Sequence, residues 1–449
     1  MRIDKIEIEN FKLFAKQSFE FNPEFNLLVG INGSGKTSLL RAIAVALGGW
    51  AHAYIKNEKN YRTILDEEVR EIQLDNRFDK SKETSIRSFG QAIIIDSYNK
   101  KKNAQFDWAR IRYEGGLEEI TGSIKYQQSS GYSSVYRLSF DVLGQDILTY
   151  IENNQSFDLP LIAFYECDRL WLAKNELNIE ASAKAKYSRF DPYIDCFHTG
   201  ADHQAIGEWL LKYELVSLQK QNQQDTPILH SIKNAARGAL ENCTDIKFDF
   251  EQSRVMVEFT DNKAIPFEYL SDGQRTLLGL FCDIARRVAI LNPHFGGEAS
   301  TNTSGVVLID ELDLHLHPIW QRKVIENLRT LFPKIQFFCT THSPFIIQSL
   351  RSSDELIMLD NDPLAEYGNK GIEDIAKNMG VLRPDVSVRY EEMKNAAKDY
   401  LQLLDEMVLT PEEKQECYQK KLAELVAPYA DNPAYQAFLE LKYAVKAGE

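Results

Sequence analysis

A short stretch near the start of the chain has the residue types and spacing of a phosphate-binding loop. Residues 30–37 read GINGSGKT and match the pattern GxxxxGK[ST] at every fixed position. Glycines let backbone N–H groups surround phosphate oxygens, Lys36 places a positive charge on the β- and γ-phosphates, and the Thr37 hydroxyl can bind Mg²⁺. We therefore expect nucleotide to be bound by Asn32, Gly33, Ser34, Gly35, Lys36, Thr37 and Ser38.

Two carboxylates follow a second apolar run. Residues 306–309 read VVLI, and Asp310 and Glu311 come directly after them. Because the carboxyl ends of parallel strands meet at one edge of a sheet, we expect both acids beside the phosphate loop. Asp310 would help to hold Mg²⁺, and Glu311 would polarise the attacking water as the general base. Many strands end in acids, so the pattern becomes specific only together with the preceding loop.

A third motif lies before a helix. Residues 270–275 read LSDGQR and precede the apolar spacing of a helix over 276–291. A small hydroxyl and a glycine at a helix N-terminus form a second anion-binding site.

Apolar runs and helical spacing predict the elements that position these motifs. Further strands are expected at 25–29, 246–250, 255–259 and 335–340, and further helices at 206–218, 227–240 and 319–331. The segment 52–244 is interpreted as an insertion with strands and a helical lid or arm. The expected domains are 1–51 and 245–365 as two parts of one head, 52–244 as the insertion and 366–449 as a helical interaction region.

The order of the motifs resembles the ABC-type ATPase head. The phosphate loop (Walker A), the LSxGQ-like signature, the carboxylate strand (Walker B) and the sequence CTTHSP from Cys339 occur in that order. The motifs occupy residues 1 to about 50 and 245–365, and are most similar to the RecF, SMC and Rad50-like branch. The resemblance implies an α/β fold with a mixed β-sheet around a P-loop core.

The same resemblance implies that two heads pair head to tail around ATP and Mg²⁺. The residues that would act on the nucleotide of the other head are Ser271, Gly273 and Gln274. Asp313 matches the D-loop that crosses the dimer interface, and His342 matches the switch histidine that contacts the γ-phosphate. The signature departs from LSGGQ at Asp272, which would place an acid near the nucleotide. No residue is assigned to the family's Q-loop glutamine.

Two further features of the sequence indicate which ATPases of this branch the chain resembles. About 230 residues without sustained heptads separate Thr37 from Leu270, so the long coiled coil of SMC proteins is not expected. Residues 305–318, 320–322, 332–337 and 432–439 resemble stand-alone ATPases of bacterial defence and retron cassettes, in particular the Septu (PtuA) family. That likeness implies an ATP hydrolase that regulates an HNH-type nuclease partner in anti-phage defence. A RecF-like DNA-repair ATPase and a nucleotide-holding scaffold with little turnover remain alternatives.

Composition limits the classes of partner. Of 449 residues, 52 are Lys or Arg and 66 are Asp or Glu, and this balance argues against a generally basic nucleic-acid coat protein. DNA binding by a local basic patch stays open. No run of eighteen apolar residues occurs, so we expect a cytoplasmic protein without membrane contact. The expected protein partners are a second copy in a dimer or a higher oligomer, and the nuclease.

The C-terminal region carries an apolar stripe at helical spacing. Its members are Tyr390, Met393, Ala397, Tyr400, Leu404 and Met407. Such a stripe must be buried, either against the head or in a docking surface for a protein partner.

Overall fold

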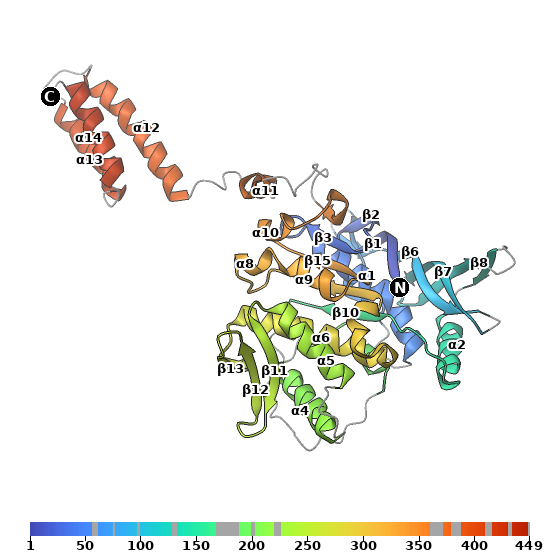
Figure 1. Ribbon diagram of the computed structural model, residues 1–449. Helices are drawn as coiled ribbons and strands as arrows, with labels where there is room; N and C mark the ends of the chain where they lie inside the picture. Colours follow the sequence, from blue (N-terminus) through green and yellow to red (C-terminus); the bar gives the residue numbers. More distant parts are fainter. Residues whose placement is uncertain are drawn as a thin grey trace. The chain divides into compact units, whose positions relative to one another are not determined.

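The computed structural model divides the chain into two compact units, Met1–Ile372 and Glu373–Glu449 (Figure 1). The residues described are 1–55, 62–74, 77–96, 99–127, 133–137, 139–167, 188–198, 203–219, 226–359, 371–378, 388–408, 415–429 and 433–447. The domain boundaries expected from the sequence stay a prediction.

A parallel sheet forms the centre of the first unit. In the described residues its strand order is β10 (Leu161–Tyr165), β14 (Gly305–Ile309), β15 (Ile335–Thr340), β3 (Phe25–Val29) and β16 (Leu356–Met358). Every residue of β3, β10, β14 and β15 is buried, which explains why these strands are rich in apolar residues on both faces. Strand β10 was not expected from the sequence, and it comes from the segment interpreted as an insertion.

An antiparallel sheet stands beside the parallel one. Its order among the described residues is β2 (Phe14–Glu20), β1 (Arg2–Phe11), β6 (Glu83–Ile95), β7 (Lys101–Tyr113), β8 (Glu118–Gln127) and β9 (Ser133–Arg137). Helix α1 (Lys36–Tyr54) contacts strands of both sheets. Trp50 of α1 packs on Phe106, Trp108 and Phe140, and the Trp108 Nε1–H donates to the Ala46 carbonyl at 3.0 Å. Because α1 follows the phosphate loop, these contacts fix the loop against the core.

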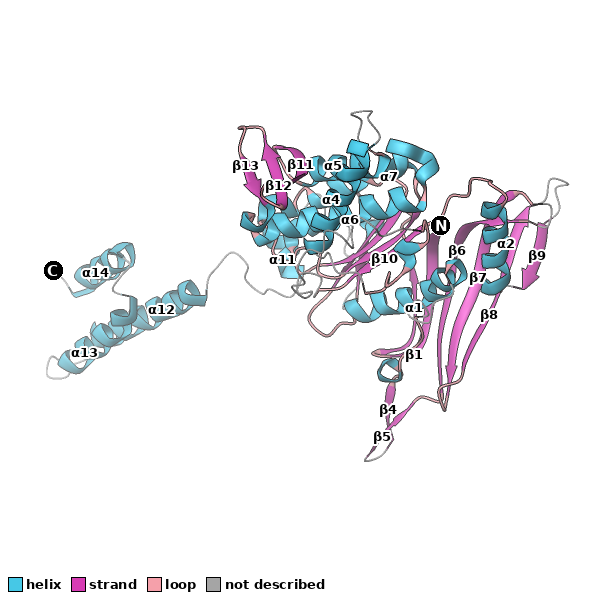
Figure 2. Cartoon of the chain, turned by 90° about the horizontal axis from the view of Figure 1, so that it is seen from below, coloured by secondary structure: helices cyan, strands magenta, loops and turns pink. Residues whose placement is uncertain are grey.

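The remaining elements of the first unit surround the two sheets (Figure 2). They include the described helices α2 (Phe140–Glu152), α4 (His203–Gln219), α5 (Pro227–Ala239), α6 (Asp272–Leu291), α7 (Ala299–Asn302) and α10 (Pro344–Ile347). They also include two small antiparallel sheets, one of β4 (Glu71–Leu74) and β5 (Arg77–Lys80), the other of β11 (Cys243–Asp249), β12 (Arg254–Phe259) and β13 (Ala264–Pro266). Helix α6 contacts α4, α5 and β10.

The single helix predicted over 319–331 was wrong, because the chain forms two helices there. They are α8 (Pro318–Gln321) and α9 (Val324–Leu331). The Gln321 side-chain amide donates to the Leu316 carbonyl at 2.8 Å, and the Ser349 hydroxyl donates to the Arg322 carbonyl at 3.1 Å. The bond from Ser349 takes up a backbone carbonyl at the break, and apolar spacing does not reveal such a contact.

Helices build the second unit. They are α12 (Val388–Val408), α13 (Gln415–Val426) and α14 (Pro433–Ala447), and α11 (Ile372–Asn378) begins at the boundary between the units. Their core holds Tyr400, Leu404, Leu422, Tyr435 and Leu439, with Met393 and Ala397 packed against it. Within this unit the structure therefore buries two members of the predicted stripe, Tyr400 and Leu404, and partly buries Met393 and Ala397. The side chains of Tyr390 and Met407 lie outside the described residues.

None of the described helices is both long enough and apolar enough to cross a bilayer.

Candidate functional site

The loop between β3 and α1 has the backbone geometry that its glycines predict. Gly33 has φ 87° and Gly35 has φ 103°, a region of the Ramachandran plot that favours glycine. A Cβ atom on Gly35 would also lie 2.9 Å from Cζ of Phe14 on β2. Helix α1 starts from Gly35 without a side-chain cap, so its first N–H groups remain available at the loop.

Lys36 is folded back over this loop. Its Nζ donates to the Gly30 carbonyl at 2.8 Å and to the Ile31 carbonyl at 2.9 Å. The Ser34 hydroxyl oxygen is buried and has no hydrogen-bond partner among the described residues. Buried polar atoms are rarely left unpaired, so a positive charge and an unpaired hydroxyl fit a loop built to receive phosphate oxygens.

Three side chains from three elements meet beside the loop. The Thr37 hydroxyl of α1 donates to the Asp310 carboxylate at 3.1 and 3.3 Å, and the Thr340 hydroxyl of β15 donates to Asp310 Oδ1 at 2.6 Å. The Asp310 N–H in turn donates to the Tyr165 carbonyl of β10 at 2.8 Å. The site thus brings together a hydroxyl and a carboxylate, the oxygen donors that Mg²⁺ prefers.

Glu311 follows with a strained backbone. Its φ is 50°, an uncommon value for a residue with a side chain, and its N–H donates to the Thr340 hydroxyl oxygen at 2.7 Å. Thr340 therefore binds both carboxylate residues, Asp310 through the side chain and Glu311 through the backbone. Such local strain persists where the surroundings fix it, and it turns the half-buried Glu311 out of the line of strand β14.

Asp313 and His342, which were expected from the sequence to belong to one site, are brought together. The Asp313 carboxylate accepts from the Thr341 hydroxyl at 2.6 Å and from the His342 N–H at 3.4 Å. The His342 side chain is exposed. Asp313 therefore orders the chain after β15, and leaves the imidazole at the surface.

Ser271 and Gln274 form a capping box at the start of α6. The Gln274 N–H donates to Ser271 Oγ at 3.4 Å, and the Ser271 N–H donates to Gln274 Oε1 at 3.0 Å. A Cβ atom on the buried Gly273 would lie 2.5 Å from the carbonyl oxygen of His315. Only glycine fits there, so the start of α6 is packed against the loop that follows the carboxylates. Asp272 pairs with Arg275 and points to solvent.

Glu166, which was not expected from the sequence to belong to the site, directly follows β10 as Asp310 follows β14. Its carboxylate lies 3.8 Å from Arg41 of α1 and 3.4 Å from His198 Nδ1. The hydrogen bond to His198 lowers the pKa of Glu166, and the same bond raises the pKa of His198. The apolar run LIAFY before an acid was a usable signal, since it repeats the pattern of residues 306–311.

A second missed feature is a buried charged network on α6. The Asp283 carboxylate accepts from the Tyr165 hydroxyl at 2.8 Å, from Arg286 at 2.8 Å and from Arg287 at 2.7 Å. Burial alone would raise the pKa of Asp283, but Arg287 and Arg286 hold it below its usual value. The network joins α6 to the strand next to β14. Thr340, the last residue of β15, was also not expected from the sequence to bind the carboxylate of Asp310.

Known proteins resemble the chain over most of its length. Residues 2–362 match the family described as RecF/RecN/SMC N terminal domain. The Retron Vc95 probable ATPase of Vibrio cholerae serotype O1 biovar El Tor is 25% identical over 81% of this chain and 74% of the relative. The Septu protein PtuA of Bacillus thuringiensis is 26% identical over 90% of this chain and 89% of the relative. A solved SmcHead bound to the C-winged helix domain of ScpA aligns with TM-score 0.45 and 15% identity, covering 79% and 93% of the two chains.

Proposed function

Because the chain belongs to the RecF/RecN/SMC N-terminal domain family, we propose that it binds and hydrolyses ATP and regulates a partner nuclease in bacterial antiviral defence. The hydrolytic part rests on one observation. Thr37, Asp310 and Thr340 are hydrogen-bonded to one another beside the phosphate loop, and the same threonine holds the backbone of Glu311. These contacts support the proposal of a metal-binding pair and a general base at one edge of the sheet.

Each residue has a separate task in the proposed reaction. Thr37 and Asp310 would hold Mg²⁺, which neutralises charge on the β- and γ-phosphates. Lys36 would move from the loop carbonyls to the phosphate oxygens. Glu311 would accept the proton of a water whose oxygen bonds to the γ-phosphorus, while the bond to the β–γ bridging oxygen breaks and ADP leaves. His342, which is exposed and lies two residues after the end of β15, would contact the γ-phosphate.

Two variants separate hydrolysis from binding. Glu311→Gln should keep ATP affinity and lower turnover by about 10² or more, because the water loses its base. Lys36→Ala should instead weaken ATP binding itself. Nucleotide affinity by calorimetry and phosphate release by a coupled assay give the two quantities. A Glu311→Gln chain that turns over at the wild-type rate would show that another group is the base.

We also propose that two heads pair head to tail, with Ser271, Gly273, Gln274 and Asp313 of each chain facing the nucleotide of the other. The support is the exposed capping box of Ser271 at the start of α6, packed through Gly273 against the loop that carries Asp313. Arginine in place of Ser271 would fill the anion site.

Mixing variants tests the trans arrangement. Lys36→Ala and Ser271→Arg chains should each be inactive alone, and their mixture should recover activity from one composite site in each mixed dimer. Ser353→Arg, the same change at an exposed serine outside the site, should behave like the wild type. A mixture that stays as inactive as either variant alone would contradict pairing in trans.

The defence role is drawn from relatives that span most of the chain. The retron and Septu proteins match over 81% and 90% of it, whereas the RecF protein of Heliobacterium modesticaldum matches over 28%. This difference favours a defence ATPase over a DNA-repair ATPase, and the expected nuclease would be a separate protein. DNA-stimulated turnover without any co-purifying nuclease would instead favour the repair function.

The C-terminal unit is the proposed place of contact with protein partners, either the nuclease or further copies. Its helices bury their own core, and the proposed ATP site lies wholly in residues 30–38, 271–274 and 310–342. Deletion of residues 386–449 should therefore leave ATP binding intact and abolish partner co-purification and phage protection. If the truncated chain retains its partner, the docking surface belongs to the first unit.

A further inference from the structure

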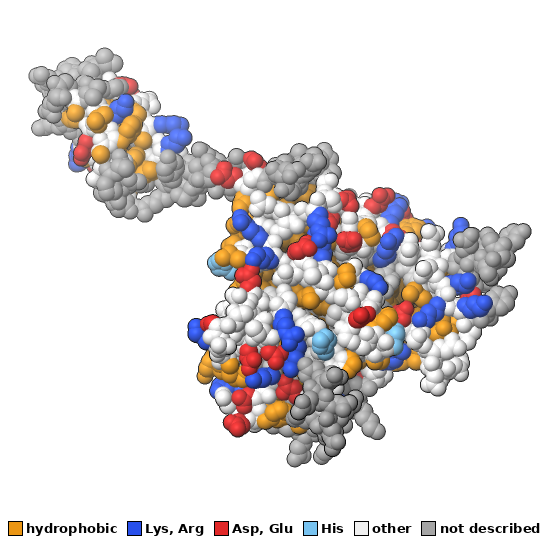
Figure 3. All heavy atoms as spheres, viewed as in Figure 1, with side chains coloured by type: hydrophobic (Ala, Val, Ile, Leu, Met, Phe, Trp, Pro, Cys, Tyr) orange, Lys and Arg blue, Asp and Glu red, His pale blue; other side chains and the backbone are white. Residues whose placement is uncertain are grey.

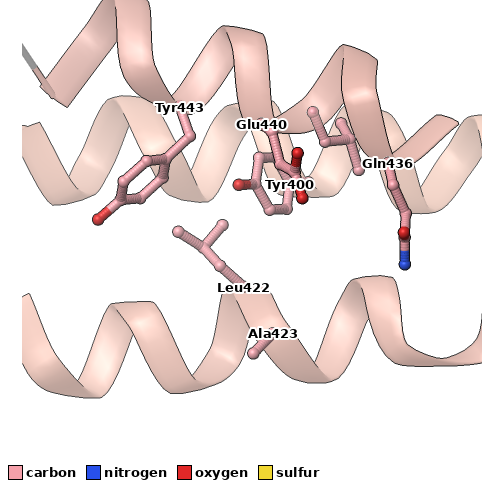
Figure 4. A pocket seen from close by; sticks show the side chains of 7 residues that line it. Tyr400, Leu422, Ala423, Gln436, Glu440 and Tyr443 are labelled. Carbon is pink, nitrogen blue, oxygen red and sulfur yellow. The ribbon is translucent and has the colours of Figure 1, made fainter. Parts of the chain in front are cut away.

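The C-terminal unit contains an open groove between two of its helices. Helices α13 and α14 both pack on α12, and a cavity of about 460 Å³ lies between them. Its lining residues are Tyr400, Leu422, Ala423, Gln436, Leu439, Glu440 and Tyr443. Figure 4 shows Tyr400, Glu440 and Tyr443 facing the helix that carries Leu422 and Ala423.

The lining of this groove combines apolar and polar surface in similar amounts. Tyr400, Leu422 and Leu439 form its floor and belong to the core of the unit. Among the described residues that line it, Glu440 is the only one with a formal charge, and its side chain is exposed. A matching occupant must present apolar side chains and a cation next to them.

Helix α14 itself presents such a surface. Phe438 is 46% exposed and Leu441 is 63% exposed, and their spacing of three residues places them on one side of the helix. The Lys442 ammonium lies 5.7 Å from the centre of the Phe438 ring. At 3.6 residues per turn, Phe438 and Leu441 lie roughly opposite Gln436 and Glu440, so they do not fill the groove of their own chain. Figure 3 shows hydrophobic side chains gathered on this unit.

We propose that the groove is occupied by a second copy of this chain, which inserts Phe438 and Leu441 and pairs its Lys442 with Glu440. The apolar floor of the groove matches Phe438 and Leu441, and the Lys442 cation meets the Glu440 carboxylate at the groove. This rests on the proposed interaction role of the C-terminal unit, but not on ATP hydrolysis. Because the groove and the insert lie on opposite sides of α14, each copy can insert into the next and be filled by the one before. The contact between C-terminal units is therefore heterologous and can repeat from copy to copy.

Two exposed positions allow each half of the contact to be removed separately. Ala423→Arg blocks the groove and leaves the insert, and Leu441→Glu removes the insert and leaves the groove. In sedimentation velocity without nucleotide, the full-length wild type should form species that grow beyond dimers with concentration. Each variant alone should associate at least about 30-fold more weakly, the loss expected for an interface hot spot. Gln402→Arg, at an exposed position of α12 outside the groove, is the matched control and should associate like the wild type.

The mixture of the two variants gives the sharpest outcome. The Ala423→Arg chain still has its insert, and the Leu441→Glu chain still has its groove. Each pair of chains can therefore form one contact and no second one, so the mixture should yield 1:1 dimers and nothing larger. Both variants should bind ATP like the wild type, which separates this contact from the nucleotide-dependent pairing of heads.

Charge exchange tests the orientation of the contact. Glu440→Lys and Lys442→Glu should each weaken association, because like charges then meet, and the double variant should restore it. A wild type that stays monomeric without nucleotide overturns the proposal, as does an Ala423→Arg chain that associates normally. If Ala423→Arg loses a co-purifying nuclease from a chain that does not self-associate, the groove belongs to that protein instead.

Discussion

Thr340→Val removes one hydroxyl that the structure connects to both Walker B carboxylate residues. Thr340 is buried, donates to Asp310 Oδ1 at 2.6 Å and accepts from the Glu311 N–H at 2.7 Å. Valine keeps the shape of the side chain and makes neither bond. The backbone of Glu311, already at φ 50°, then loses the partner that holds it there.

The two lost bonds set the size of the effect. A hydrogen bond to a charged group contributes about 1.5–3 kcal/mol, and a buried N–H left without a partner costs about 1–3 kcal/mol. If about 3 kcal/mol of this total is lost from the positioning of Asp310 and Glu311, turnover should fall by about 10²-fold. Asp310 keeps its bond from Thr37, so Mg²⁺ should still bind, but at higher concentration.

ATP turnover measured over a range of Mg²⁺ concentrations checks this expectation. Thr340→Ser is the matched control, because it keeps the hydroxyl and loses only a methyl group. The serine variant should keep turnover within a few-fold of the wild type, whereas the valine variant should lose about 10²-fold and need more Mg²⁺. Equal turnover of the two variants would show that Thr340 does not position the carboxylates.

Three further perturbations give distinct results. Glu166→Gln should lower the raised pKa of His198 toward its usual 6.5, as an NMR titration would show. In the wild type, the contribution of His198 to the free energy of unfolding should be complete below pH 6.5 and should be lost as the pH rises through the raised pKa. Asp283→Asn should lower the free energy of unfolding by about 3–5 kcal/mol in a denaturant titration, because two buried arginines lose their counter-charge. Gly35→Ala should lower the unfolding temperature without nucleotide more than Gly33→Ala does, because both residues have positive φ but only Gly35 is crowded, by Phe14.

The sequence was informative where chemistry and local pattern coincide. The phosphate loop has fixed spacing, and the strand before Asp310 is an apolar run buried on both faces, so both could be predicted and placed at one edge. The capping box at Ser271 is likewise local. It is formed by residues three apart, and its place at the start of α6 matches the predicted helix.

Features that depend on distant pairing could not be predicted in the same way. Strand β1 pairs with β6 about eighty residues later, as Ile6 opposite Ser88 shows, and no local signal encodes that register. The role of Thr340 is visible only when β15 lies beside β14 with Ile309 opposite Cys339. Glu166 was missed because β10 is a five-residue run inside a segment that otherwise supplies strands and helices outside the parallel sheet, and only its pairing with β14 reveals its place.

The position of α6 relative to the carboxylate edge is fixed by two contacts of different kinds. At its start, Gly273 lies against the His315 carbonyl, and three turns later Asp283 binds the Tyr165 hydroxyl next to β14. Any movement of the exposed Ser271 cap toward a second chain must therefore carry the end of β10 with it or break a buried charged network, at a cost of about 3–5 kcal/mol. Because breaking the network is costly, the anion site of α6 and the carboxylates should move as one body when two chains close around nucleotide.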